Sequence, residues 1–271
     1  MRAYIEGIGL CGPGLAGWVQ AVPILAGKMD YVPAAAEIPS SALLPANERR
    51  RAPKTVKLAL AAAAEAFGAA GRDAADAATV FASSGGDGET IHDILTMLAA
   101  PARELSPTKF HNSVHNAAAG YWSIATGAVT ASTSLCAHDD SFAAGLLEAC
   151  AQATAAQEAV ALIAYDVPYP APLFAARPVG AVFGVALVLA GVPSPAAFAR
   201  LDLALNAGAG APTAALPALE DLRQSTPAAR ALPLLSAIAS GVASGVTLRY
   251  LEDMNVHLTV TPRPAFGWPQ P

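Results

Sequence analysis

Charged side chains are scarce in this chain, and those present do not favour nucleic acid. Asp, Glu, Lys and Arg together make up 14% of the 271 residues, whereas soluble domains average about 25%. The formal net charge is −5, and the three consecutive arginines at 49–51 form the densest positive run. Because a nucleic-acid-binding face needs an excess of Lys and Arg, the composition argues against such a partner.

Cysteines and long apolar runs are also rare. The three cysteines are odd in number and widely spaced, at Cys11, Cys136 and Cys150, which is typical of a reducing compartment. The longest strongly apolar stretch, 179–192, has 14 residues, whereas a membrane helix needs about 20. Glu6 and the glycines after it interrupt the apolar start of the chain, unlike a signal peptide. We therefore expect a cytoplasmic protein without a membrane span.

Apolar side chains, in contrast, are abundant at 54%, and many of them are alanine. This content excludes intrinsic disorder, because the chain can bury a large core. Strand-like and helix-like segments alternate over the first 190 residues, which is typical of a layered α/β domain around a buried sheet. The expected strands are 3–10, 79–83, 128–134, 158–165, 180–189 and 198–205. The expected helices are 15–26, 55–70, 90–98, 116–126 and 139–155, with a loop at 101–110.

Beyond residue 206 the pattern changes. Helices are expected at 217–224 and 228–240, and two short strands at 246–251 and 256–260. We detect no internal repeat in the sequence.

The first glycines match a nucleotide-binding pattern. Gly7, Gly9 and Gly12 form G-x-G-x-x-G at the end of the first expected strand, as in turns that bind a pyrophosphate. The acidic residue required further along would be Asp30, but the residues before it lack a strand pattern, and Pro13 would lie in the phosphate cradle. A plain tight turn between strand and helix is therefore the preferred interpretation, with nucleotide binding as an alternative.

His111 and His115 are spaced so that both could face one side of a helical turn. Zinc requires three or four ligands, and His138, Asp139 and Asp140 could add to this pair only through the tertiary fold. Neither CxxC nor HExxH is present. We therefore expect no metal site, and interpret these histidines as residues that order a loop or line a pocket.

Cys136 lies between an expected strand and an expected helix. A thiol at a helix N-terminus gains thiolate stabilisation from the helix dipole. Asp139 and Asp140 follow at once, however, and nearby carboxylates oppose thiolate formation. Cys136 is thus a weak candidate nucleophile, and Cys11 and Cys150 are expected in the core.

The segment 106–147, SPTKFHNSVHNAAAGYWSIATGAVTASTSLCAHDDSFAAGLL, resembles the middle of the N-terminal half of β-ketoacyl synthases. The stretches IEGIGLCGPG, RRRAPKTVKLALAAAAEA and FASSGGDGET resemble the first strand, the following helix, and the second strand with its loop. FHNSVHN and AAAGYWSIATG resemble the chain-length-factor-type homologues of bacterial aryl polyene gene clusters. The resemblance covers residues 1–192. It implies a thiolase-like layered α/β fold with a complete N-terminal half and a truncated C-terminal half, 193–271, that packs on it.

The function that we expect depends on the motifs in which this chain differs from the family. A working synthase has a Cys nucleophile in a T-A-C-like elbow, and two histidines in H-G-T-G-T-like and N-S-F-G-like motifs. This chain has neither histidine motif, and its only histidine after residue 138 is His257. Its elbow reads STSLCAHDD, and counting back from Gly145 places the nucleophile position at Ala137 rather than Cys136. The condensation needs a thiolate, an oxyanion hole and histidines that stabilise the enolate.

The resemblance therefore implies a non-catalytic chain-length factor that needs no cofactor. Such a subunit forms a heterodimer with a full-length β-ketoacyl synthase and meets the acyl carrier protein through that complex, in aryl polyene or fatty-acid-like biosynthesis. The family's strand before the elbow packs at the dimer interface, and residues near the elbow line the acyl tunnel. The positions that this implies as tunnel or interface residues are Phe110, His111, Asn112, His115, Asn116, Tyr121, Trp122, Ser134, Leu135, Cys136, Ala137, His138 and Phe142.

Four large side chains in that set are candidates to limit the length of the tunnel: Phe110, Tyr121, Trp122 and Phe142. Ordinary core packing is the alternative for each of them. Two other functions stay open: an independent acyltransferase that uses Cys136 with His111, His115 or His138, and a purely structural or nucleotide-binding subunit. An alanine-rich apolar surface favours an obligate complex, because large exposed apolar patches mark protein interfaces.

Overall fold

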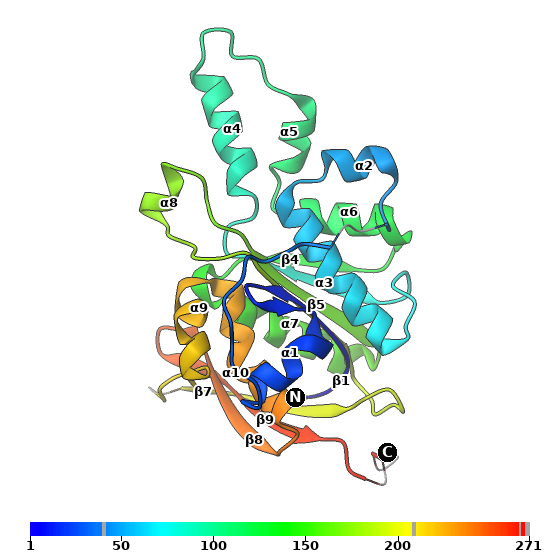
Figure 1. Cartoon of the computed structure of the whole chain (residues 1–271). Helices are drawn as coiled ribbons and strands as arrows, with labels where there is room; N and C mark the ends of the chain where they lie inside the picture. The colour runs from blue at the N-terminus through cyan, green and yellow to red at the C-terminus, as the bar shows by residue number, and fades with distance from the viewer. Residues whose placement is uncertain (40–41, 208–209, 266, 269–271) are drawn as a thin grey trace.

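The computed structural model describes residues 1–39, 42–207, 210–265 and 267–268. In these residues nine strands form one sheet, with helices on both faces (Figure 1). The order across the sheet is β4-β3-β5-β6-β1-β7-β9-β8, and β2 pairs with β1. The strands are β1 (Arg2–Gly12), β2 (Leu15–Ala16), β3 (Ala78–Ala82), β4 (Ser132–Leu135), β5 (Ala159–Asp166), β6 (Phe183–Ala190), β7 (Ala199–Ala207), β8 (Ser244–Leu251) and β9 (Met254–Pro262).

Helices cover the two faces of the sheet and bury two apolar layers. One layer holds α3 and α6, and the other holds α1, α7 and α10. The helices are α1 (Trp18–Leu25), α2 (Ala46–Arg51), α3 (Lys54–Ala70), α4 (Gly88–Ala99), α5 (Pro107–Asn112), α6 (Ala117–Thr126), α7 (Ser141–Ala156), α8 (Leu173–Ala176), α9 (Glu220–Ser225) and α10 (Leu232–Ser240). Three 3₁₀ turns complete the list: η1 (His138–Asp140), η2 (Pro217–Leu219) and η3 (Pro227–Ala231).

Helix α3 lies against the central strand β1 because glycines remove the side chains between them. A Cβ placed on Gly7 would lie 2.0 Å from the carbonyl oxygen of Ala66, and one on Gly9 would lie 1.9 Å from that of Ala62. The G-x-G-x-x-G pattern therefore lies inside β1. A tight turn does follow β1, at Pro13 and Gly14, but it leads into β2 and not into a helix, so the strand-to-helix turn that a phosphate site requires is not formed by these glycines.

The sheet contains an internal repeat that the sequence does not reveal. Helix α7 leads into the antiparallel hairpin β5–β6, and β6 pairs with β1. Helix α10 leads in the same way into the hairpin β8–β9, and β9 pairs with β7. The strands β1 and β7 are antiparallel neighbours at the junction. Helix α10 with the strands β7, β8 and β9 thus forms a second unit that continues the sheet of the first.

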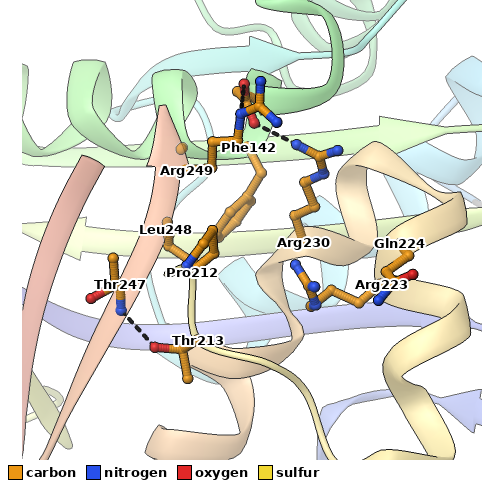
Figure 2. Close-up of a pocket in the computed structure, with 11 residues that line it drawn as sticks. Phe142, Pro212, Thr213, Arg223, Gln224, Arg230, Thr247, Leu248 and Arg249 are labelled. Carbon is orange, nitrogen blue, oxygen red and sulfur yellow. Dashed lines mark hydrogen bonds and ion pairs between the residues drawn. The ribbon is translucent and has the colours of Figure 1, made fainter. Parts of the chain in front are cut away.

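The two units differ at their outer edges. The first unit continues beyond β5 into the parallel strands β3 and β4. In the second unit, β8 is the last strand of the described sheet, and its outer edge bonds to the loop residue Thr213, beside a cavity (Figure 2).

Three expected elements differ from the structure. The helix expected at 15–26 begins only at Trp18, because Leu15 and Ala16 form β2. Residues 101–110 are not all loop, because α5 begins at Pro107 behind the N-cap Ser106. The strand expected at 128–134 is reduced to the four residues of β4, because 127–131 form a turn that follows α6.

Candidate functional site

The elbow is the sharp turn that joins β4 to α7, and it is held by its own hydrogen bonds. His138 adopts a left-handed backbone conformation with φ of 52°, which is uncommon for a residue with a side chain and marks local strain. The Ser141 hydroxyl donates to the His138 carbonyl at 2.7 Å, and the Ala137 N–H donates to that hydroxyl at 3.0 Å. Ser141 thus locks the turn from its C-terminal side.

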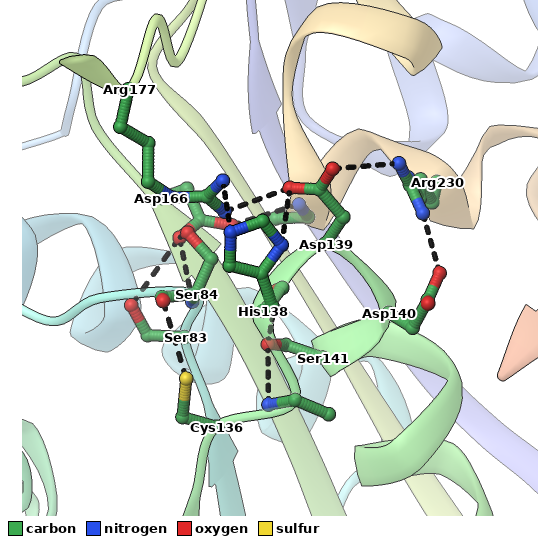
Figure 3. Close-up of polar contacts among 12 residues, drawn as sticks. Ser83, Ser84, Cys136, His138, Asp139, Asp140, Ser141, Asp166, Arg177 and Arg230 are labelled. Atoms are coloured by element: carbon green, nitrogen blue, oxygen red, sulfur yellow. Dashed lines mark hydrogen bonds and ion pairs between the residues drawn. The ribbon is translucent and has the colours of Figure 1, made fainter. Parts of the chain in front are cut away.

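The elbow projects its polar side chains into a cluster of arginines (Figure 3). Arg177 donates to Nε2 of His138 and to Asp139, both at 2.7 Å. Because arginine can only donate, Nε2 must accept, so the neutral ring carries its proton on Nδ1. The hydrogen bond from Arg177 therefore fixes the orientation of the His138 ring and uses its acceptor nitrogen, although the side chain is 71% exposed.

The two aspartates after His138 are paired with arginines from other parts of the chain. Arg230 bonds Asp139 at 3.1 Å and also bonds Asp140. Partial burial by itself raises the pKa of Asp139, but the hydrogen bond from Arg177 and the charge of Arg230 outweigh it, so this pKa lies below its usual value. The pKa of Asp140 is raised, because its burial outweighs the attraction of Arg230 and Arg249.

Asp166, at the end of β5, is a buried hub beside the elbow. Its Oδ1 accepts hydrogen bonds from the Ser84 N–H at 2.9 Å, the Ser84 hydroxyl at 2.7 Å and the Ser83 hydroxyl at 3.3 Å. Its Oδ2 accepts from the Ala228 N–H at 2.9 Å. Burial raises the pKa of Asp166 to about 6 against these four donors. The carboxyl thus joins the end of β3 to η3.

Cys136 and His115 both bond to the loop that Asp166 holds. The exposed thiol of Cys136 donates to the Ser84 carbonyl at 3.2 Å, and Nε2 of His115 lies 3.2 Å from the Ser83 carbonyl. A carbonyl only accepts, so His115 carries its proton on this nitrogen. This nitrogen is therefore a donor to the loop after β3, and in this state it accepts no proton.

The remaining predicted residues divide between core and surface. Tyr121, Trp122 and Phe142 are each at most 2% exposed, whereas Phe110 is 62% exposed. The Tyr121 hydroxyl donates to the buried Asn112, and its ring meets His111 edge to face at 5.9 Å. Of the other positions, Asn116 is the exposed N-cap of α6, and Ser134, Leu135 and Ala137 are half-buried on β4 and the elbow.

Exposed apolar side chains occur on α4, α5, α6 and the turn before β4. Helices α4 and α5 extend away from the sheet (Figure 1), and the only buried residues of α4 are Gly88 and Thr90. The exposed apolar side chains on this arm and on the neighbouring α6 and turn are Ile91, Leu95, Leu98, Leu105, Phe110, Val114, Ile124 and Val129. Helix α4 packs only against α5 among the elements of the arm, and apolar side chains that stay exposed on such a helix are typical of an interaction site.

Strand β4 adds an open edge to that surface. It pairs with β3 on one side, and it is the outermost strand of the described sheet on the other. Val129, in the turn before it, is 97% exposed. An unpaired strand edge can accept a strand from another chain.

Neither a metal-binding group nor a membrane helix is found in the described residues. No cluster there of three or more His, Cys, Asp or Glu side chains could hold a metal ion. In the same residues no helix combines the length and the apolar character that crossing a membrane requires. Cys11 and Cys150 are buried, as expected.

Sequence reasoning missed the residues that organise the elbow. Ser84, Asp166, Arg177 and Arg230 come from four separate segments, and none was in the predicted set. Asp166 offered a signal, since it is a lone acid that ends a strand of buried apolar residues. The arginines offered none, because their partners lie 38 to 91 residues away in the sequence.

The comparisons with known proteins find similarity to the β-ketoacyl synthase family model and to structures that contain ketosynthases. Residues 26–243 match the family model described as "Beta-ketoacyl synthase, N-terminal domain". A structure described as a ketosynthase (ApeO) in complex with its chain length factor (ApeC), from Xenorhabdus doucetiae, superposes with a TM-score of 0.73 at 20% identity, covering 96% of this chain and 99% of the other. Among curated proteins, none matches.

Two further structures are similar over nearly their whole length. One is described as the ishigamide ketosynthase/chain length factor, with a TM-score of 0.70, 14% identity and coverage of 97% of this chain and 99% of the other. The second is described as AntDE:AntF, a type II PKS acyl-carrier protein in complex with its ketosynthase bound to the hexaketide. Its TM-score is 0.72 at 11% identity, with coverage of 96% and 99%.

Proposed function

The chain belongs to the β-ketoacyl synthase family and has the thiolase-like α/β fold of its ketosynthase neighbours. From that premise we propose that it is a chain-length-factor subunit without condensing activity of its own. It forms a heterodimer with an active β-ketoacyl synthase, and it shapes the acyl tunnel of that partner during aryl polyene or related polyketide synthesis. The acyl carrier protein reaches it through the complex.

The proposal rests on the elbow, where the thiol and the nearby histidines are already engaged in hydrogen bonds within the chain. A ketosynthase nucleophile needs a free thiolate and nearby histidines. Here the Cys136 thiol donates to a carbonyl, His115 presents a donor to the same loop, and His138 is held by Arg177. His257 alternates along β9 with Val256 and Leu258, which lie in the core with α7, so it faces away from that layer.

The arm and the β4 edge support a partner at this end of the molecule. Burying one Leu or Ile side chain contributes about 1.5–3 kcal/mol, and α4 alone exposes Ile91, Leu95 and Leu98. In a monomer these side chains would stay in water. A ketosynthase surface that covers these side chains removes them from water. A strand of the partner that pairs with β4 also satisfies the open edge of the sheet.

Among the four candidates for limiting tunnel length, the exposed Phe110 is the one that we favour. Tyr121, Trp122 and Phe142 are packed within this chain, where they hold α6 and α7 against the sheet. Phe110 lies on the short helix α5 of the arm. Its ring can enter a cavity of the partner without any rearrangement of the core.

The test is co-expression with the full-length ketosynthase of the same gene cluster, followed by native mass spectrometry and product analysis. We expect a 1:1 complex that makes product. Val129→Glu, at the exposed turn before β4, should abolish assembly, because it would bury a charge in the interface. Val242→Glu is the matched control, since Val242 is 65% exposed and precedes β8 at the opposite edge of the sheet.

The complex then tests the role of Phe110. Phe110→Ala should lengthen the product while the 1:1 assembly persists. Assembly that ignores both valine substitutions would refute the proposed interface. An isolated chain that forms an acyl-enzyme on Cys136 would refute the non-catalytic role and favour an independent acyltransferase.

A further inference from the structure

A cavity of about 230 Å³ lies between the start of α7, η3, α9 and the edge strand β8 (Figure 2). Its charged lining residues are Arg223, Arg230, Arg249 and Asp140, three positive and one negative, in a chain whose net charge is −5. We propose that this cavity binds a small dianion of the phosphate class. This inference does not depend on the proposed function.

Each arginine keeps unused donors. A guanidinium carries five N–H bonds. Arg223 donates from Nε and Nη2 to Glu220, and Arg230 donates from Nη1 and Nη2 to the elbow aspartates. The guanidinium of Arg249 makes one weak ion pair, with Nε 3.5 Å from Asp140, and no side-chain hydrogen bond joins it to another described residue.

The acidic partners hold the guanidinium groups without filling the cavity. Glu220 and Asp139 do not line it. Glu220 also accepts from the Ala215 N–H at 2.8 Å and from Gln224 at 2.7 Å, so it is a fixed support for Arg223. The three arginines come from α9, η3 and β8, and these elements bring them to one cavity (Figure 2).

The chemistry of the lining favours phosphate. Two parallel N–H bonds of an arginine guanidinium can donate to two oxygens of one phosphate group. Arginine accepts no hydrogen bonds and does not ligate metals. Phe142 and Leu248 form buried apolar walls, which strengthen the attraction of an anion by excluding water. The cavity holds either a free phosphate ion or the phosphate group of a small phosphomonoester.

The incomplete second unit of the sheet explains why this cavity exists. In the first unit the parallel strands β3 and β4 cover the edge of β5. The corresponding edge of β8 is spanned by Thr213, whose N–H donates to the Thr247 carbonyl and whose hydroxyl accepts from the Thr247 N–H, both at 2.8 Å. Space that strands would fill is therefore open beside Arg249.

The experiment is isothermal titration calorimetry on the full chain, or on its complex, at low ionic strength. Inorganic phosphate and glycerol 3-phosphate are titrated separately, and chloride serves as the monovalent control. We expect saturable 1:1 binding of at least one dianion. Tighter binding of glycerol 3-phosphate would identify a phosphomonoester as the ligand, whereas equal or weaker binding would identify the free ion.

The matched variants are Arg249→Gln at the cavity and Arg50→Gln on the exposed face of α2. Each removes one positive charge. Arg249→Gln should weaken binding at least about tenfold, because it removes charge-assisted hydrogen bonds, whereas Arg50→Gln should leave the affinity unchanged. The Arg249 side chain is 55% exposed, so this variant is expected to fold, and thermal unfolding checks it.

Three results would overturn the proposal: no saturable binding of either dianion, equal weakening by both substitutions, or displacement of the dianion by an equal concentration of chloride. Each would show that the arginines serve only to neutralise Asp139, Asp140 and Glu220. Arg249→Lys refines a positive result, because it keeps the charge and removes the fork. We expect its affinity to fall between those of the wild type and Arg249→Gln.

Discussion

Replacing Asp166 with asparagine changes one atom at the hub that joins β3 to η3. The three donors from Ser83 and Ser84 meet Oδ1, and an asparagine oxygen in that place still accepts from the two that lie closest, both from Ser84. The amide nitrogen would then face the Ala228 N–H, which now donates to Oδ2. Two donors cannot bond each other, so the variant leaves a buried N–H unpaired at a cost of about 1–3 kcal/mol.

The wild-type carboxyl also couples stability to pH. Burial raises its folded-state pKa to about 6, above the value of 3.8 for an unperturbed carboxyl. The folded state therefore binds the proton more tightly, and the free energy of unfolding falls as pH rises through the interval between these two values. A shift of this size corresponds to about 3 kcal/mol, at about 1.4 kcal/mol per pKa unit. Asp166→Asn removes this dependence.

Urea unfolding of both proteins at about pH 4 and pH 7.5 tests the reasoning. At the lower pH the variant should be less stable than the wild type, by the cost of the unpaired Ala228 N–H. At the higher pH the difference should move in favour of the variant by about 2.4 kcal/mol, because the unfolded carboxyl is already partly ionised at pH 4. A difference that is the same at both pH values would refute the raised pKa. Asp76→Asn, which removes an exposed carboxyl, is the control.

Three further predictions concern single side chains. Cys136→Ala should leave the turnover of the ketosynthase complex nearly unchanged; loss of turnover in an intact complex, assayed by product formation, would contradict the non-catalytic role. Gly9→Ala places a Cβ 1.9 Å from the Ala62 carbonyl oxygen and should lower the free energy of unfolding by about 1–3 kcal/mol or more. Gly68→Ala meets no atom within 4 Å of its Cβ and should raise that free energy by about 0.5–1 kcal/mol. Denaturant titration measures both changes. Trp122→Ala should lower the free energy of unfolding by about 3–5 kcal/mol without changing product length. A changed product length in a folded complex would show that Trp122 lines the tunnel.

Local signals in the sequence predicted most of the first unit. Helix α3 begins after Pro53 and ends at Gly71, which adopts the left-handed conformation with φ of 62°, as the helix-start and helix-stop pattern indicated. The strands β5 and β6 were also predicted, because each is a continuous apolar run. Both strands are buried along almost their whole length. Signals of this kind depend on neighbouring residues.

Features that depend on distant residues were not predictable. The pairing of Arg177 and Arg230 with the elbow exists only after the chain has folded, and so do the hydrogen bonds of Asp166, although its position at the end of a buried strand was visible. The repeat of two hairpins was invisible, because it is a repeat of connections and not of residue types. The exposure of Phe110 beside the burial of Trp122 also depends on how α5 and α6 pack, and periodicity in such short helices cannot decide it.

The position of β1 has a consequence for synthesis. This strand lies at the centre of the sheet, but its partners β6 and β7 begin at residues 183 and 199. A nascent chain can pack α3 on β1 early, but the ten almost fully buried residues of β1 lack their neighbouring strands β6 and β7 until nearly two hundred more residues have left the ribosome. Contacts so distant in sequence slow folding and prolong exposure of apolar surface. During translation, β1 is the segment that most needs protection by a chaperone.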